Sequence, residues 1–160
     1  MEIATLVEQH YESLYRFAYR LSGQASDADD LTQQAFLDAQ RKLDTLRDPD
    51  KARAWLFMIV RNLYRRRLRD QGSHPEVTLE GVGEPASEEI SLQPLDSETL
   101  QGVLNELPDE FRTVLVLFYF QELSYREISD ELEVPIGTVM SRLSRGKKHL
   151  RQRLTPEDFQ

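Results

Sequence analysis

A stretch near the middle of the chain limits what the whole sequence can fold into. Residues 71–95 hold three of the seven glycines and three of the seven prolines, but no lysine, arginine or aromatic residue. Because it lacks a sustained apolar period, this stretch cannot bury enough surface to offset the entropy lost on ordering. The sequence therefore predicts a flexible linker over residues 71–96, between a first domain at 1–70 and a second at 97–154.

The negative charge of the chain is concentrated in and around this linker. Within a net charge of −8, residues 1–70 carry 12 basic and 11 acidic side chains, and residues 106–160 carry 8 and 10. Residues 71–105 carry seven acidic side chains and no basic one. Proteins that bind DNA on their own usually have a basic domain, because phosphate neutralisation supplies much of their affinity. A DNA-binding role for this chain would therefore require another protein that delivers it to DNA.

The first domain is predicted to consist of helices. Apolar side chains near the start of the chain recur at intervals of three and four and form one face, namely Leu6, Val7, His10, Leu14, Phe17, Ala18 and Leu21. Gly23 is expected to end this helix, and Ser26 is expected to cap a second one at about 27–43. After a turn, a third helix is predicted at about 51–69, with a second half rich in arginine.

The second domain is also predicted to be helical, so the expected fold class is all-α. Short helices are predicted at 98–107 and 109–121. The apolar run VLVLFYF at 114–120 would also suit a buried strand, because periodicity alone does not separate the two. The sequence offers no second strand-like run to pair with it, and an isolated strand is not stable. A helix is therefore the preferred interpretation of this run.

A helix-turn-helix is predicted near the end of the chain. Ser124 and Glu127 have the spacing of a capping box, which opens a helix that ends near residue 132. Pro135 stops that helix, because the residue before a proline disfavours the helical conformation. A second helix is expected to open at residues 137–138, with Thr138 as its N-cap. A short helix, a tight turn and a second helix form the pattern of a DNA-binding module.

The second helix of this module has two distinct faces. The face predicted to be buried is formed by Val139, Leu143, Gly146 and Leu150. The face predicted to be exposed and to enter the major groove is formed by Thr138, Ser141, Arg142 and Arg145. Arginine can donate two hydrogen bonds to a guanine there, and the following Lys147 and Lys148 suit phosphate. The same pattern is also compatible with a solvated amphipathic helix that closes a small bundle.

A second basic cluster lies on the helix predicted at 51–69. Arg61, Asn62 and Arg65 stand around Tyr64, and such a mixture of charge, amide and ring suits an unpaired nucleic-acid strand. A basic helix end exposed to solvent is the alternative. Trp55 is expected to belong to the core rather than to such a site.

These stretches resemble the extracytoplasmic-function sigma factors, members of the sigma-70 family of bacterial RNA polymerase subunits. Residues 27–43 are similar to region 2.2 of that family, residues 53–69 to region 2.4, and residues 107–151 to region 4. The resemblance covers nearly all of the chain except the linker. It implies two small helical domains, with core RNA polymerase and promoter DNA as partners, and an anti-sigma factor is common in the family.

The resemblance also implies roles for individual residues. The contact with polymerase would be made by Asp30, Leu31, Gln33, Gln34 and Phe36. The −10 promoter element would be contacted by Arg61, Asn62 and Arg65, and a flipped base would enter a specificity loop that contains Leu46, Arg47 and Asp48. The −35 element would be contacted by Thr138, Ser141, Arg142 and Arg145, with Lys147 and Lys148 beside them. The chain departs from the family pattern at Arg66, Asp70 and Met140, and the last position is often a lysine.

Other classes of function have less support in the sequence. The chain has no cysteine, which excludes disulfides, thiolate zinc sites and a cysteine nucleophile. His10, His74 and His149 lie in separate segments, and no phosphate-binding GxxxxGK[ST] loop is present. We expect no catalytic residue, cofactor or metal, and a cytoplasmic protein without a secretory signal. A free-standing helix-turn-helix regulator, which binds an operator as a dimer without polymerase, is the nearest alternative.

Overall fold

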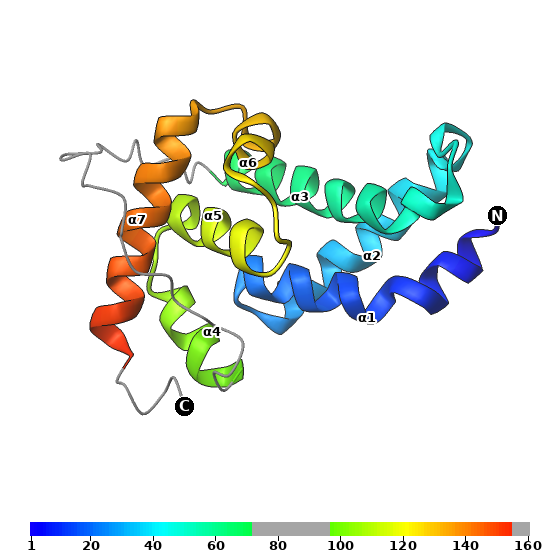
Figure 1. The fold of residues 1–160 in the computed structure, drawn as a ribbon. Helices are drawn as coiled ribbons and strands as arrows, with labels where there is room; N and C mark the ends of the chain where they lie inside the picture. Colours follow the sequence, from blue (N-terminus) through cyan, green and yellow to red (C-terminus); the bar gives the residue numbers. More distant parts are fainter. Residues whose placement is uncertain (72–96, 155–160) are drawn as a thin grey trace. The chain divides into compact units, whose positions relative to one another are not determined.

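The fold is known from a computed structural model that describes residues 1–71 and 97–154 (Figure 1). Within those ranges the chain forms only α-helices and short 3-10 turns, so the prediction of an all-α fold is confirmed. The chain divides into two compact units, Met1–Pro75 and Glu76–Gln160. Most of the predicted linker, at 72–96, lies outside the described residues. No helix in the described part is long and apolar enough to cross a membrane.

Unit 1 contains three long helices, α1 (Ile3–Ser22), α2 (Ala25–Arg41) and α3 (Ala52–Asp70). Two 3-10 turns, Leu43–Thr45 and Pro49–Lys51, connect α2 to α3. Each of the three helices packs against the other two (Figure 1). They enclose one apolar core.

The core of unit 1 follows the apolar periodicity of the sequence. Leu6, Leu14 and Leu21 of α1 are fully buried. Phe17 of α1 meets Phe57 of α3 edge to face, with 5.1 Å between the ring centroids. Aromatic pairs favour this geometry because the positive edge of one ring faces the negative face of the other. The predicted apolar face of the first helix is therefore confirmed for Leu6, Leu14, Phe17, Ala18 and Leu21, whereas Val7 and His10 are half-buried.

The residue predicted to end α1 is confirmed, whereas the residue predicted to cap α2 is not. Gly23 has a left-handed backbone with φ of 77°, and its N–H donates to the Tyr19 carbonyl at 2.8 Å, as expected of a helix stop. The N-cap of α2 is Gln24, so the prediction that Ser26 caps this helix is wrong. Gly23 turns the chain so tightly that the helix resumes two residues later, and Ser26 then lies inside its first turn.

Unit 2 contains four helices in the described part, α4 (Ser97–Asn105), α5 (Asp109–Tyr119), α6 (Tyr125–Leu132) and α7 (Ile136–Arg153). The apolar run at 114–120 lies almost entirely in α5, so its interpretation as a helix is confirmed. Its first four residues, 114–117, are completely buried. A run this apolar is a central helix because neighbouring helices cover it on several sides.

The contact between α5 and α7 is the main packing interface of unit 2. The predicted stripe on α7 is confirmed, since Val139, Leu143, Gly146 and Leu150 are all buried. At Gly146 the approach is so close that an added Cβ would lie 2.8 Å from Leu115 Cδ1 and 2.9 Å from its Cγ. Leu115 is itself fully buried, so it has little room to move aside.

Gly146→Ala is expected to lower the free energy of unfolding of unit 2 by about 1 kcal/mol. Overpacking a core costs about 1–3 kcal/mol, and replacing a helical glycine with alanine recovers about 1 kcal/mol. Urea denaturation followed by circular dichroism measures the difference.

Gly137→Ala is the matched control on the same helix, because a Cβ at Gly137 meets nothing within 4 Å. We expect that variant to gain at most about 1 kcal/mol from helix propensity, since Gly137 lies in the first turn of α7 rather than in its interior. An equal gain in both variants would contradict a tight contact between Gly146 and Leu115.

Candidate functional site

The helix-turn-helix of unit 2 is held together by hydrogen bonds at its turn. The Ser124 hydroxyl accepts from the Glu127 N–H at 3.1 Å, and the Ser124 N–H donates to the Glu127 carboxylate at 3.0 Å, which confirms the capping box. After α6 the chain turns at Glu133, whose backbone is left-handed with φ of 56°. The Ser129 hydroxyl donates to the Val134 carbonyl at 2.6 Å and fastens this turn to α6.

α7, the second helix of the module, begins earlier than predicted. Pro135 is its N-cap and Ile136 its first residue, so the prediction that Thr138 is the N-cap is wrong. The Pro135 carbonyl accepts from the Thr138 N–H at 2.9 Å, which places Thr138 in the first turn. Proline suits the start of a helix because its fixed φ is compatible and its missing N–H would have no helical partner there.

The side chains predicted to face DNA differ in their exposure. Lys148 is exposed, and Thr138 and Arg145 are half-buried. Ser141 exposes only 5% of its surface, so the prediction that its side chain is exposed is wrong. A serine side chain reaches only a short way from the helix axis, so any partner must approach the backbone closely to contact it. The contact of these residues with DNA stays a prediction.

Arg142 and Lys147 pack against their own unit. Arg142 is half-buried near Glu110 of α5, and burial lowers the pKa of its guanidinium while the charge of Glu110 opposes that shift. Lys147 is buried, with its ammonium 5.4 Å from the ring centroid of Phe118 and 5.8 Å from that of Tyr119. Arg142 is therefore only partly exposed and Lys147 is buried, because both flank the stripe that packs on α5. The contact of these two residues with DNA stays a prediction.

The far end of α7 is fastened to the loop that follows α4. Glu106 accepts hydrogen bonds from Arg153 Nε at 2.9 and 2.8 Å, and His149 Nε2 lies 3.3 Å from the same carboxylate. The bond from Arg153 is the main cause of a lowered pKa for Glu106 and of a raised pKa for Arg153. Sequence analysis assigned Arg153 no such partner, because 47 residues separate the two side chains.

On α3, the residues predicted to line the −10 site are only partly exposed. Asn62 is exposed and Arg65 is half-buried, but Arg61 exposes only 9% of its surface. Arg61 lies one turn from Phe57 and one turn from Tyr64, which are both buried, so it shares their side of the helix. Little of the Arg61 side chain is therefore open to solvent, and its contact with the −10 element stays a prediction. The DNA contacts of Asn62 and Arg65 stay predictions.

The predicted specificity loop is the short connection between the two 3-10 turns. Leu46 is half-buried, whereas Arg47 and Asp48 are exposed. The Asp48 carboxylate accepts from the Asp50 N–H at 3.0 Å and caps the second turn, with Pro49 following it. This capped turn leads directly into α3 and thereby fixes the C-terminal end of the loop. Capture of a base by this loop stays a prediction.

The residues predicted to contact polymerase lie on different sides of α2. Asp30 and Gln33 are exposed, but Leu31 and Phe36 are buried in unit 1. Both belong to the core that joins α2 to its neighbours, and the contact of the five residues with polymerase stays a prediction. Leu37, which sequence reasoning missed, exposes 51% of its surface. It lies four residues from Gln33 and seven from Asp30, on the same exposed face.

Phe36 is covered by an aromatic side chain from α1. The ring of Tyr11 stacks on Phe36 with 6.1 Å between centroids and 8° between planes. The Tyr11 hydroxyl donates to Asp29 at 3.0 Å, and this bond is the main cause of a raised pKa for Tyr11. Asp29 also accepts from Gln33 at 3.0 Å, so this network orders the first half of α2.

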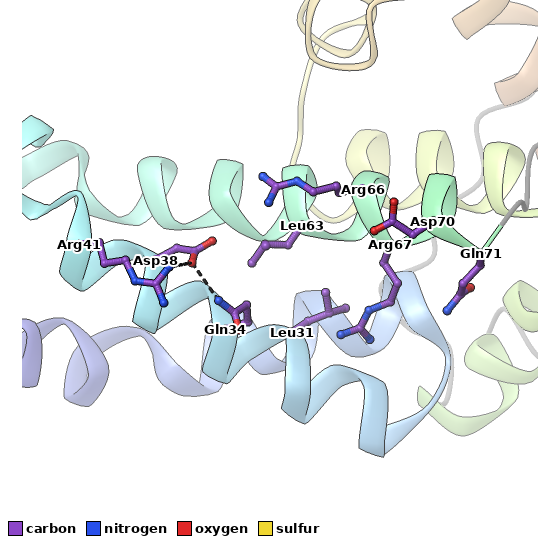
Figure 2. Close-up of a pocket in the computed structure, with 9 residues that line it drawn as sticks. All are labelled: Leu31, Gln34, Asp38, Arg41, Leu63, Arg66, Arg67, Asp70 and Gln71. Carbon is purple, nitrogen blue, oxygen red and sulfur yellow. Dashed lines mark hydrogen bonds and ion pairs between the residues drawn. The ribbon is translucent and has the colours of Figure 1, made fainter.

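A groove of about 530 Å³ runs between α2 and α3 (Figure 2). Leu31 and Leu63 line it, together with charged side chains of both signs, namely Asp38, Arg41, Arg66, Arg67 and Asp70. Gln34 Nε2 donates to Asp38 at 2.9 Å, as Figure 2 shows. A mixture of charges suits a protein partner better than a nucleic-acid backbone, which attracts basic groups alone. Of the predicted polymerase residues, Leu31 and Gln34 line this groove.

No group of three or more histidine, aspartate or glutamate side chains in residues 1–71 and 97–154 is placed to hold a metal ion. The adjacent carboxylates Asp29 and Asp30 point to different sides of α2, since successive helical residues are 100° apart. Asp29 is occupied by Tyr11 and Gln33.

Both units match known families. Residues 6–74 match the family described as Sigma-70 region 2, and residues 97–150 match Sigma-70, region 4. The chain is 38% identical to the ECF RNA polymerase sigma factor SigE of Mycolicibacterium smegmatis, over 93% of this chain and 60% of that protein. It is 32% identical to the ECF RNA polymerase sigma factor SigW of Bacillus subtilis, over 94% of this chain and 88% of that protein. It thus spans most of SigW but less than two thirds of SigE.

Solved structures with a similar fold include two complexes. The sigma factor RpoE in complex with the anti-sigma factor NepR from Bartonella quintana gives a TM-score of 0.66 and 28% identity, and the match covers 94% of each chain. CnrH in complex with the cytosolic domain of CnrY gives a TM-score of 0.56 and 26% identity, covering 94% of this chain and 85% of that one.

Glu106→Gln is expected to lower the melting temperature of unit 2 at neutral pH, because it removes the carboxylate that holds Arg153 and His149. A lowered pKa means that the carboxylate stabilises the folded state above its unfolded pKa, and that this stabilisation is lost as the pH falls through the folded pKa. The difference in melting temperature between wild type and variant should therefore shrink below about pH 4.5, the usual glutamate value. Thermal unfolding across pH measures it.

Glu98→Gln on the exposed side of α4 is the control, since it removes the same charge without breaking this contact. We expect little change in melting temperature from that variant. A Glu106→Gln deficit that stays constant between neutral and acid pH would show that the ion pair is not its cause.

Proposed function

The chain belongs to the extracytoplasmic-function sigma factors of the sigma-70 family, and we propose on that basis that it binds core RNA polymerase and directs it to specific promoters. Unit 1 docks on the polymerase and stabilises the melted −10 strand. Unit 2 contacts the −35 duplex through α7. Binding an unpaired base supplies free energy for melting, and the chain itself acts as a binding subunit rather than an enzyme.

The observation that carries this proposal is the helix-turn-helix of unit 2, followed by the basic residues of α7. A capped α6, a hydrogen-bonded turn and an α7 packed on α5 give the geometry by which such modules insert their second helix into the major groove. Lys148 is exposed toward the end of that helix, where a cation suits phosphate.

Dependence on polymerase is supported by the charges of the chain. The net charge of −8 opposes binding to DNA by the free protein. Several basic side chains of unit 2 are also engaged inside it, as Lys147 and Arg142 illustrate. A subunit of this kind contacts promoter DNA when the polymerase supplies most of the electrostatic attraction. That role places the protein in the cytoplasm.

Polymerase is proposed to contact the exposed face of α2 formed by Asp30, Gln33 and Leu37, and the groove beside it. This face has an apolar centre with polar neighbours, which is the usual composition of a protein interface. An anti-sigma factor is proposed as a further partner, supported by similarity to RpoE, which was solved with NepR.

A free-standing helix-turn-helix regulator is the competing function. It would bind its operator as a dimer without polymerase. A gel shift with promoter fragments, with and without core polymerase, separates the two functions. A sequence-specific shift by the chain alone would favour the regulator, and a shift that needs polymerase would favour the sigma factor.

Leu37→Ala is expected to weaken binding to core polymerase by about 10-fold. Burying a leucine side chain at an interface is worth about 1.5–3 kcal/mol, part of which alanine retains. Fluorescence anisotropy of the labelled chain titrated with core polymerase gives the Kd. Met58→Ala is the control, since it removes a 37% exposed apolar side chain from α3 of the same unit. Equal Kd values for wild type and Leu37→Ala would place the polymerase contact elsewhere.

Arg145→Ala and Arg142→Ala should have different effects. Arg145→Ala should weaken promoter binding by the holoenzyme by about 1–3 kcal/mol if it contacts a base in bidentate fashion. Arg142→Ala should mainly destabilise unit 2, because Arg142 packs beside Glu110. Promoter binding and thermal unfolding are measured for both variants. Arg16→Ala, which removes an exposed arginine of α1, is the control. Loss of polymerase binding in Arg145→Ala would indicate a structural role instead.

A further inference from the structure

The first two turns of α7 carry apolar side chains that the protein leaves uncovered. Ile136 exposes 46% of its surface and Met140 exposes 37%. They are four residues apart, so they lie one above the other on the same side of the helix. Large apolar side chains so exposed are rare within residues 97–154, where most of the leucines and valines are buried. Residues 134–141 include no charged side chain.

The position of this pair matters because of how a helix-turn-helix docks. The N-terminal residues of its second helix are those that contact base edges in the major groove. In α7 these residues are Ile136 to Ser141, whereas the arginines predicted to contact bases follow in the later turns. Gly137 lies between the two apolar residues, and open space surrounds its Cβ position. The backbone of this turn can therefore come close to a base edge.

The chemistry of the pair selects one kind of base. The Ile136 side chain can neither donate nor accept a hydrogen bond, and the Met140 thioether is only a weak acceptor. Neither side chain therefore gains much from the polar edges of guanine, adenine or cytosine. Thymine alone presents an apolar group in the major groove, its 5-methyl group, and apolar side chains contact that group. Burying one methyl-sized group against an apolar surface is worth about 0.8 kcal/mol, which is about a fourfold change in affinity.

We propose that Ile136 and Met140 determine specificity by contacting thymine 5-methyl groups in the −35 element. This inference rests on the proposed function and adds the base that the first turns of α7 prefer. Lys148 and the positive end of the helix dipole attract the DNA phosphates. The apolar pair then distinguishes T·A from the other base pairs.

Two exposed side chains are too small an area to hold a stable dimer of this chain, since specific interfaces bury about 1,200–2,000 Å². The charge of α7 itself also favours DNA, because no acidic side chain lies in its first three turns and Lys148, later in the helix, is exposed. We therefore infer that Ile136 and Met140 contact DNA rather than a second copy of the chain.

The experiment uses the holoenzyme formed from the full chain and core RNA polymerase. Duplexes randomised across the −35 element are selected for binding, and the preferred element is then synthesised with deoxyuridine in place of each thymine. Deoxyuridine pairs as thymine does but lacks the 5-methyl group. We expect at least one substitution to weaken binding about fourfold.

Variants locate the effect on the helix. Ile136→Ala and Met140→Ala should each abolish the distinction between thymine and deoxyuridine at one position. Met140→Lys should shift the selected base at its position from thymine toward guanine, whose N7 and O6 accept hydrogen bonds from lysine. Met58→Ala, with the same 37% exposure on α3, should keep the distinction unchanged. Circular dichroism checks that each variant folds.

The outcomes separate this inference from the proposed function. Equal binding to thymine and deoxyuridine at every position, or a selected element without thymine, overturns the inference and leaves the sigma-factor function standing. A failure of polymerase to enrich any element contradicts the sigma-factor function and the inference with it. Loss of polymerase affinity, or of a dimer, in Ile136→Ala or Met140→Ala would assign the pair to a protein contact and overturn the inference.

Discussion

The close contact between α5 and α7 at Gly146 is the constraint on which the second unit depends. A Cβ at this position would lie 2.8 Å from Leu115 Cδ1, so the absence of a side chain is what lets the two helices approach. Leu143 and Leu150, on either side of Gly146, are buried in the same interface. The hydrogen bond from Ser129 to Val134 fixes the near end of α7, and Glu106 fixes the far end. The helix proposed to contact DNA is therefore held in one orientation.

The orientation of α7 determines which of its side chains pack inside unit 2 and which remain accessible to a partner. Lys147 and Arg142 flank the buried stripe and are drawn into contacts with α5, where rings and Glu110 partly replace the water they lose. The opposite side and the first turns are left for a partner. Uncharged residues come first and basic ones later, so the apolar base contacts that we propose lie on the first turns, before the charged contacts of Arg145 and Lys148.

Unit 1 offers a different kind of surface. Its three helices bury two of the five residues that family resemblance implied for the polymerase contact, Leu31 and Phe36, and leave Leu37 exposed. The groove between α2 and α3 carries charges of both signs, which is typical of a protein partner (Figure 2). Since the chain is acidic overall, the DNA contact that we propose for unit 2 requires the polymerase that this surface is proposed to bind.

The sequence by itself determined the all-α class, the capping box at Ser124, the stop at Gly23 and the buried stripe of α7. These follow from local chemistry, because a cap, a left-handed turn and a period of three to four residues act within one or two turns of the chain. Only the tertiary structure decided which polar side chains are open to a partner. Ser141, Lys147 and Arg61 carry the residue types of a binding face, yet their burial depends on neighbours supplied by packing. Periodicity gives the direction of a side chain around its helix, but the accessible surface is set by what packs against it.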